Sequence, residues 1–112
     1  MGILWRLITT SLPPFTTYES TLFASSVAPL ALRTKMNIGD MVSGDALRIR
    51  IYTVNQSGGA FNVEYDTSYN GEQSIPVIDL PAVQSQWGVA VSTQLTSGSA
   101  TGKTLECMWF QA

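Results

Sequence analysis

The feature that most constrains the fold of this chain is an alternation of apolar and polar residues with a period of two. It is clearest where Leu47, Ile49 and Ile51 alternate with Arg48 and Arg50. Because successive side chains of a β-strand point to opposite faces, this pattern predicts a strand with one buried face. Later segments repeat the pattern, and no window of about a dozen residues has the i, i+3, i+4, i+7 spacing of an amphipathic helix. The chain is therefore expected to be all-β.

Turn residues divide the chain into about eight short antiparallel strands. Asn55–Gly59 predicts a hairpin loop, and Asn70-Gly71 is the dipeptide of a type I′ turn. Pro76 and Pro81 flank a segment that should lie at a sheet edge, because proline cannot donate to a strand ladder. The expected strands are residues 3–11, 17–24, 27–36, 46–54, 60–66, 72–79, 87–95 and 103–110.

Short strands joined by glycine-rich turns are typical of a single β-sandwich of Greek-key or jelly-roll type. The 112 residues are enough for one domain. We assign residues 1–28 to an apolar N-terminal arm and the first strands, and residues 29–112 to the sandwich core of the same domain. The side chains expected to fill that core are Leu47, Ile49, Ile51, Phe61, Val63, Trp87, Val89, Val91, Leu105 and Trp109.

Composition argues against most enzymes and cofactor sites. The chain has no histidine, which excludes Ser-His-Asp and Cys-His centres and zinc sites that contain histidine. Its single cysteine, Cys107, excludes an intrachain disulfide and is expected to be a buried, inert thiol. The net charge is −2 with six basic residues, so a nucleic-acid groove is not expected, and no apolar run approaches a membrane-spanning helix. We expect no catalytic residues, no cofactor and no metal.

Two motifs suggest ligand sites, and each has a simpler structural interpretation. Gly98–Thr104 ends like a phosphate-binding P-loop, but the residues after it alternate as a strand instead of opening a helix. We therefore expect a hairpin loop, with Lys103 exposed. Asp40 and Asp45 flank a turn and could hold calcium, although capping of the turn explains them better.

Large apolar residues also fall where a solvated surface would be expected. Ile3, Leu4, Trp5, Leu7 and Ile8 crowd the N-terminus. Tyr52, Met108 and Phe110 point away from the core face of their strands, which suggests a second covered surface. That cover could be the N-terminal segment or a partner protein. We predict an assembly interface composed of Ile3, Leu4, Trp5, Leu7, Ile8, Phe15, Tyr52, Met108 and Phe110.

Residues 32–109 also carry an ordered set of features. Gly44-Asp45 precedes the strand that begins at Leu47, and an aromatic strand follows around Phe61 and Tyr65. Gly71–Ser74 then leads into the segment between the two prolines. Gly88–Val91, a Thr-Ser-Gly loop and a strand that ends in Trp109 complete the series. In this order the chain resembles small all-β virion-associated proteins of tailed phages and archaeal viruses.

The resemblance implies a virion module without catalytic residues. We expect a minor capsid, decoration or cement subunit located in the virion, with copies of itself and other virion proteins as partners and no nucleic acid or membrane. The alternative is a carbohydrate- or receptor-binding sandwich of a phage fibre or spike. That module would bind a glycan at one end through Tyr65, Tyr69, Asn70 and Gln73.

Overall fold

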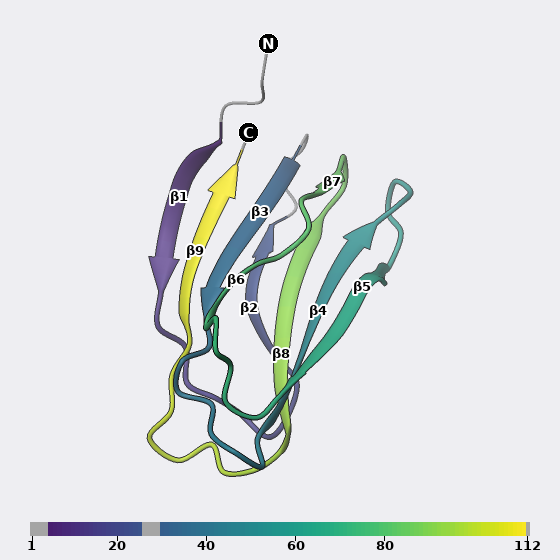
Figure 1. Cartoon of the computed structure of the whole chain (residues 1–112). Helices are drawn as coiled ribbons and strands as arrows, with labels where there is room; N and C mark the ends of the chain where they lie inside the picture. Colours follow the sequence, from purple (N-terminus) through teal and green to yellow (C-terminus); the bar gives the residue numbers. More distant parts are fainter. Residues whose placement is uncertain (1–4, 26–29, 112) are drawn as a thin grey trace.

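The structure is a computed structural model that describes residues 5–25 and 30–111. Those residues form nine strands in two sheets that face each other (Figure 1). No helix in the described ranges has the length and apolar character needed to cross a membrane. The strands are β1 (Arg6–Ser11), β2 (Ser20–Ser25), β3 (Leu30–Asn37), β4 (Ala46–Val54), β5 (Phe61–Asn70), β6 (Val77–Asp79), β7 (Val83–Ser85), β8 (Val89–Ser97) and β9 (Glu106–Gln111).

The strand order is that of a jelly roll. One sheet has the order β1-β9-β3-β6, with β7 also paired to β3, and the other has the order β2-β8-β4-β5. The chain changes sheet at nearly every connection, while β4 and β5 form a hairpin within one sheet. All pairings are antiparallel, as in the double-sheet sandwich that the alternating pattern predicts.

Strands β6 and β7 together replace one long edge strand. β6 pairs with β3 from Lys35 to Asn37, and β7 pairs with β3 from Leu30 to Leu32. Between them the amide of Leu80 still donates to the carbonyl oxygen of Thr34, at 2.9 Å, but Pro81 has no amide proton to continue the ladder. The prediction that the proline-flanked segment lies at a sheet edge is confirmed.

The inward faces of both sheets form one hydrophobic core. Trp109 of β9 is 1% exposed, and its ring stacks on Phe23 of β2 with the ring centroids 5.0 Å apart. The indole Nε1 donates to the hydroxyl of Ser11 at 3.0 Å, so the one polar atom of this side chain is also bonded. The predicted core residues that are buried are Leu47, Ile49, Ile51, Val89, Val91, Leu105 and Trp109.

Three residues predicted for the core are instead exposed: Phe61 by 47%, Val63 by 49% and Trp87 by 38%. The pairing of β4 with β5 shifts register so that Tyr52 faces Val63 while Ile51 faces Tyr65. This β-bulge inserts one residue, which reverses the faces on which the side chains before it lie. Phe61 and Val63 therefore point outward, and Trp87 lies in the turn before β8.

The N-terminal segment belongs to both sheets. Arg6–Ser11 and Ser20–Ser25 form the edge strands β1 and β2, while residues 1–4 and 26–28 of the predicted arm lie outside the described residues.

The predicted type I′ turn at Asn70-Gly71 is wrong. Asn70 is the last residue of β5, and only Gly71, with a φ of 72°, adopts the left-handed conformation that such a turn needs at both positions.

Candidate functional site

Part of the predicted assembly interface comes together on the outer face of the five-stranded sheet. Leu7 of β1 lies opposite Phe110 of β9, and Met108 lies two residues further along the same face. Ile8 stands beside them at the register shift between Leu7 and Thr9. Leu7 is 49% exposed, Ile8 41% and Met108 39%, and Phe110 is half-buried. We call Leu7, Ile8, Met108 and Phe110 the β1–β9 strip.

The β1–β9 strip adjoins an open sheet edge. β1 is the first strand of its sheet, and among the described residues it pairs only with β9 (Figure 1). The backbone groups on its other side have no strand partner in this part of the chain, and such edges can pair with another chain. A β-bulge at Ile8 interrupts the edge, a device that limits unselective pairing.

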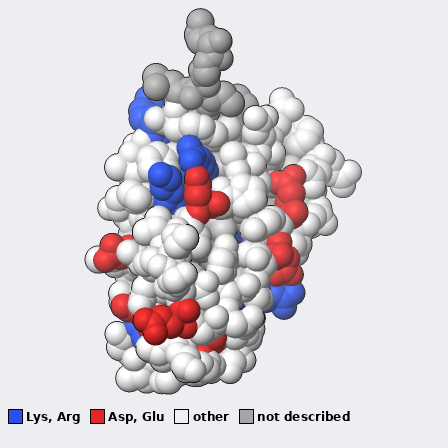
Figure 2. Space-filling model, viewed as in Figure 1, with Lys and Arg blue, Asp and Glu red and all other residues white. Residues whose placement is uncertain are grey.

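The N-terminal strand extends the apolar surface instead of covering it. β1 lies beside β9 in the plane of the sheet, so Leu7 continues the row of Met108 and Phe110. The sequence allows either the N-terminal segment or a partner protein to cover this apolar surface. The described N-terminal residues do not cover it. Charged side chains are sparse and mixed in sign on the face seen in Figure 2. On β3, which pairs with β9, Arg33 forms an ion pair with Asp79 of β6, and its Nε donates to Oδ1 at 3.1 Å.

The other predicted interface residues are dispersed. Ile3 and Leu4 lie outside the described residues, and Trp5 is half-buried just before β1. Phe15 is 3% exposed and belongs to the core, so its assignment to an interface is wrong. The backbone amide of Phe15 donates to the carbonyl oxygen of Lys103 at 2.9 Å, which joins the β1–β2 connection to the segment before β9. Tyr52 lies on the outer face of the opposite sheet.

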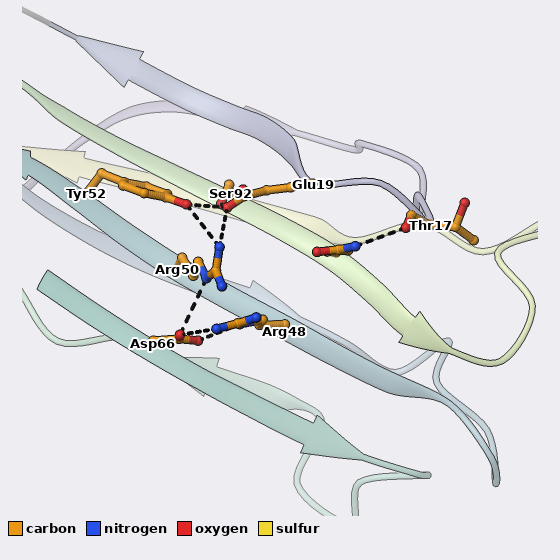
Figure 3. A network of polar contacts seen from close by, with 8 residues as sticks. Thr17, Glu19, Arg48, Arg50, Tyr52, Asp66 and Ser92 are labelled. Carbon is orange, nitrogen blue, oxygen red and sulfur yellow. Dashed lines mark hydrogen bonds and ion pairs between the residues drawn. The ribbon is translucent and has the colours of Figure 1, made fainter. Parts of the chain in front are cut away.

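The outer face of the four-stranded sheet carries a network of polar side chains (Figure 3). Glu19, just before β2, accepts through Oε2 from the hydroxyls of Tyr52 and of Ser92, the latter at 2.6 Å. Arg50 Nη1 lies 3.5 Å from the same oxygen. The hydrogen bond from Ser92, followed by that from Tyr52, lowers the pKa of Glu19 below its usual 4.5, so this side chain is a carboxylate at neutral pH.

The network continues across the sheet to β5. Arg50 Nε lies 3.4 Å from Oδ2 of Asp66, and Arg48 Nε donates to Oδ1 of Asp66 at 2.9 Å. The bond from Arg48 is the main reason that the pKa of Asp66 is lowered. Two carboxylates thus face two guanidinium groups, and the cluster of Glu19, Asp66, Arg48 and Arg50 has no net charge.

A shallow hollow of about 330 Å³ opens beside this network. Its walls combine an aromatic ring, small side chains and polar groups. The ring of Phe61 lies close to the backbone at Gly88, where an added Cβ would stand 3.3 Å from Cζ of Phe61 and 3.2 Å from Cγ2 of Val54. A larger residue at this position would require the ring or Val54 to shift by a few tenths of an ångström. The hollow is lined by Glu19, Thr21, Ala24, Tyr52, Phe61, Ala90 and Ser92.

The P-loop-like segment forms a turn held by a buried ion pair. It leads into β9, and the described residues after it form no helix. Lys103 is not exposed as expected: its Nζ lies 2.7 Å from Oδ2 of Asp45, and their side chains are 16% and 2% exposed. The bond from Lys103, with one from the amide of Val42, lowers the pKa of Asp45. The segment therefore ties the start of β4 to the connection before β9.

The remaining sequence candidates have structural roles. Asp40 accepts from the amide of Thr104 at 2.9 Å. Tyr65 and Tyr69 pack against the core from the inner face of β5. The amide of Gln73 donates to the backbone of Asn70 and Gly71. None of the four residues expected to form a glycan site lines the hollow described above.

Cys107 is 1% exposed, and burial raises the pKa of its thiol to about 11. It is therefore a neutral core thiol at physiological pH, as the sequence predicts.

No protein-family model matches the chain, and no curated protein is significantly similar to it.

Proposed function

We propose that this chain is a structural subunit of a virus particle, either a minor capsid protein or a decoration or cement protein. It acts by packing against copies of itself and other virion proteins through the β1–β9 strip. The observation that carries the proposal is the exposed apolar row of Leu7, Ile8 and Met108 beside an open strand edge. Contiguous apolar surface at an open edge is typical of protein–protein contact.

Two further features support a role in packing. The jelly roll is a fold common to capsid and lectin domains, although a fold by itself does not determine a function. Several charged side chains are already engaged with one another, as in the Asp66 and Asp45 ion pairs. The proposal includes no catalytic step, because the chain has no histidine and its one thiol is buried and neutral.

The proposal is tested on particles from the source of this sequence. An antibody raised against the purified chain should label intact particles that have been separated on a density gradient. Detection of the chain at a fixed ratio to the major shell protein would support the proposal. If the chain is found only in fractions that contain no particles, the virion role is wrong.

A second candidate function is recognition of a glycan or receptor by a fibre or spike module. The hollow on the outer face of the four-stranded sheet favours this function. Its lining residues differ from those that the sequence suggested, which were Tyr65, Tyr69, Asn70 and Gln73. The two candidates use opposite faces of the sandwich, so variants of one face leave the other intact.

A further inference from the structure

We propose that the hollow on the outer face of the four-stranded sheet binds a neutral saccharide. The proposal goes beyond the virion role and does not depend on it. It commits to one class of ligand, a hydroxyl-rich sugar ring without net charge, and three properties of the hollow support that choice.

The first property is a flat apolar wall. Phe61 is 47% exposed, and its ring lies near Gly88 and opposite Val54 of the neighbouring strand. An exposed aromatic ring offers a surface on which the C–H face of a sugar ring can pack. Ala24 and Ala90 leave room for the hollow because their side chains are small.

The second property is a hydrogen-bonding group with spare capacity next to that wall. The contacts of Glu19 with Ser92, Tyr52 and Arg50 all end on Oε2. They leave Oε1 without a hydrogen bond to the described residues. An ionised carboxylate oxygen accepts bonds from hydroxyl donors, and such charge-assisted bonds are among the stronger ones in proteins. The network holds the carboxylate in place before a ligand arrives, which reduces the cost of ordering it on binding.

The third property is electrostatic balance. Arg48 and Arg50 are both engaged by Asp66, and Arg50 also approaches Glu19. No cation of this cluster is left unpaired for an acidic ligand, and the carboxylate of Glu19 would repel an anionic sugar. The volume of about 330 Å³ is at the small end of the range for small-molecule sites, roughly 300–1,000 Å³, and is suited to one or two sugar rings.

The test measures the binding of defined sugars to the full chain. The probes are the methyl glycosides of glucose, galactose, mannose and N-acetylglucosamine, with 3′-sialyllactose as the anionic comparison. Binding is followed by saturation-transfer NMR and by calorimetry. We expect at least one neutral glycoside to bind with a Kd of about 1–10 mM, as suits a shallow and open site.

Two variants assign that binding to the hollow. Phe61→Ala and Glu19→Gln should each weaken binding about tenfold or more, which corresponds to about 1.4 kcal/mol. The matched controls are Val63→Ala, which truncates an equally exposed residue on the same face of β5, and Glu106→Gln, which neutralises an exposed carboxylate on the other sheet. Both controls should bind as the unmodified chain does, and circular dichroism should show all four variants folded.

Three results would overturn the proposal. One is the absence of binding by every neutral probe at up to about 20 mM, a concentration that would reveal even a weak site. Another is binding that Phe61→Ala leaves unchanged. The third is a different occupant of the hollow, shown either by binding of sialyllactose alone or by a self-association that Phe61→Ala abolishes.

Discussion

The outer faces of the two sheets arise from the same sequence pattern and have different surfaces. On the four-stranded sheet, each arginine of β4 reaches a carboxylate supplied by a neighbouring segment. On the five-stranded sheet, Met108 and Phe110 have Leu7 of β1 beside them, so the apolar row is extended. Alternation determines which side chains point outward, whereas the chain segment that lies alongside determines whether they are neutralised, covered or left exposed.

This comparison separates side chains that stabilise the fold from side chains that are available to a partner. The polar network links the segment just before β2 to β4, β5 and β8 and contributes to the stability of the isolated chain. The β1–β9 strip makes no comparable contribution, so its variants should change association and leave folding intact. The following variants test that separation, from the largest expected effect on stability to the smallest.

Replacement of Trp109, in β9, should have the largest effect on stability, because it removes a side chain that both sheets contact. Trp109→Ala should lower the free energy of unfolding by about 3–5 kcal/mol, through lost burial and the cavity that remains. Urea denaturation measures this. The matched control Trp87→Ala, in a turn and 38% exposed, should change stability by no more than about 0.5 kcal/mol. Equal losses in the two variants would show that the core is not centred on Trp109.

Alanine substitutions at two glycines test the close contact between Asp45 and the loop before β9. Gly98 and Gly102 both have positive φ, 96° and 71°, so alanine at either should cost about 1–2 kcal/mol of backbone strain. At Gly98 the new Cβ would also stand 1.9 Å from Oδ1 of Asp45, while Gly102 has open space around it. Overpacking should add a further loss of about 1–3 kcal/mol to Gly98→Ala alone. Thermal unfolding checks the difference, and equal melting temperatures for the two variants would contradict the described loop.

The polar network predicts a pH-dependent loss of stability. Glu19→Gln should cost about 0.5–1 kcal/mol at pH 7, because the carboxylate is partly exposed and solvent screens it. Since the pKa of Glu19 is lower in the folded chain than its usual 4.5, its contribution is full above that pH. It disappears as the pH falls through the lowered value.

Chemical unfolding at pH 7 and pH 3 measures this effect. The difference in stability between the unmodified chain and Glu19→Gln should shrink at pH 3. Glu106→Gln, which neutralises an exposed carboxylate outside the network, is the matched control. A difference for Glu19→Gln that is as large in acid as at neutral pH would mean that the charge of the carboxylate contributes nothing.

The smallest effect on stability is expected in the β1–β9 strip. Leu7→Thr with Met108→Gln should change the free energy of unfolding by about 0.5 kcal/mol or less per site, since both residues are exposed and threonine favours strands. Urea denaturation measures the change. A loss above about 2 kcal/mol would instead place these side chains among those that hold the fold together.

The sequence predicts the fold class, most strands and much of the core, because the period of two is a local property of each strand. It does not predict the outward turn of Phe61 and Val63, since a bulge opposite Tyr52 leaves no mark in the pattern of β5 itself. The short strand β7 is missed because three residues show too little alternation.

The sites are less predictable because they depend on contacts between distant segments. The bond between Ser92 and Glu19 spans 73 positions, and the pair of Lys103 and Asp45 spans 58. One feature of the sequence could nonetheless have indicated the hollow. The small residues Ala90 and Ser92 alternate with Val89 and Val91 and point outward at the start of β8, which leaves room above them for a hollow. For the strip, the outward direction of Met108 and Phe110 was correctly predicted, while Phe15 gave no sign that it belongs to the core.

The most direct test of the central claim, that the β1–β9 strip is used for assembly, is sedimentation velocity of the purified chain over a wide range of concentrations. The control is Val42→Thr with Ile75→Thr, which changes two exposed apolar side chains outside the strip. We predict that the unmodified chain and this control associate as concentration rises, whereas Leu7→Thr with Met108→Gln remains a folded monomer. The claim is contradicted if the strip variant associates as the unmodified chain does, or if the unmodified chain is monomeric throughout.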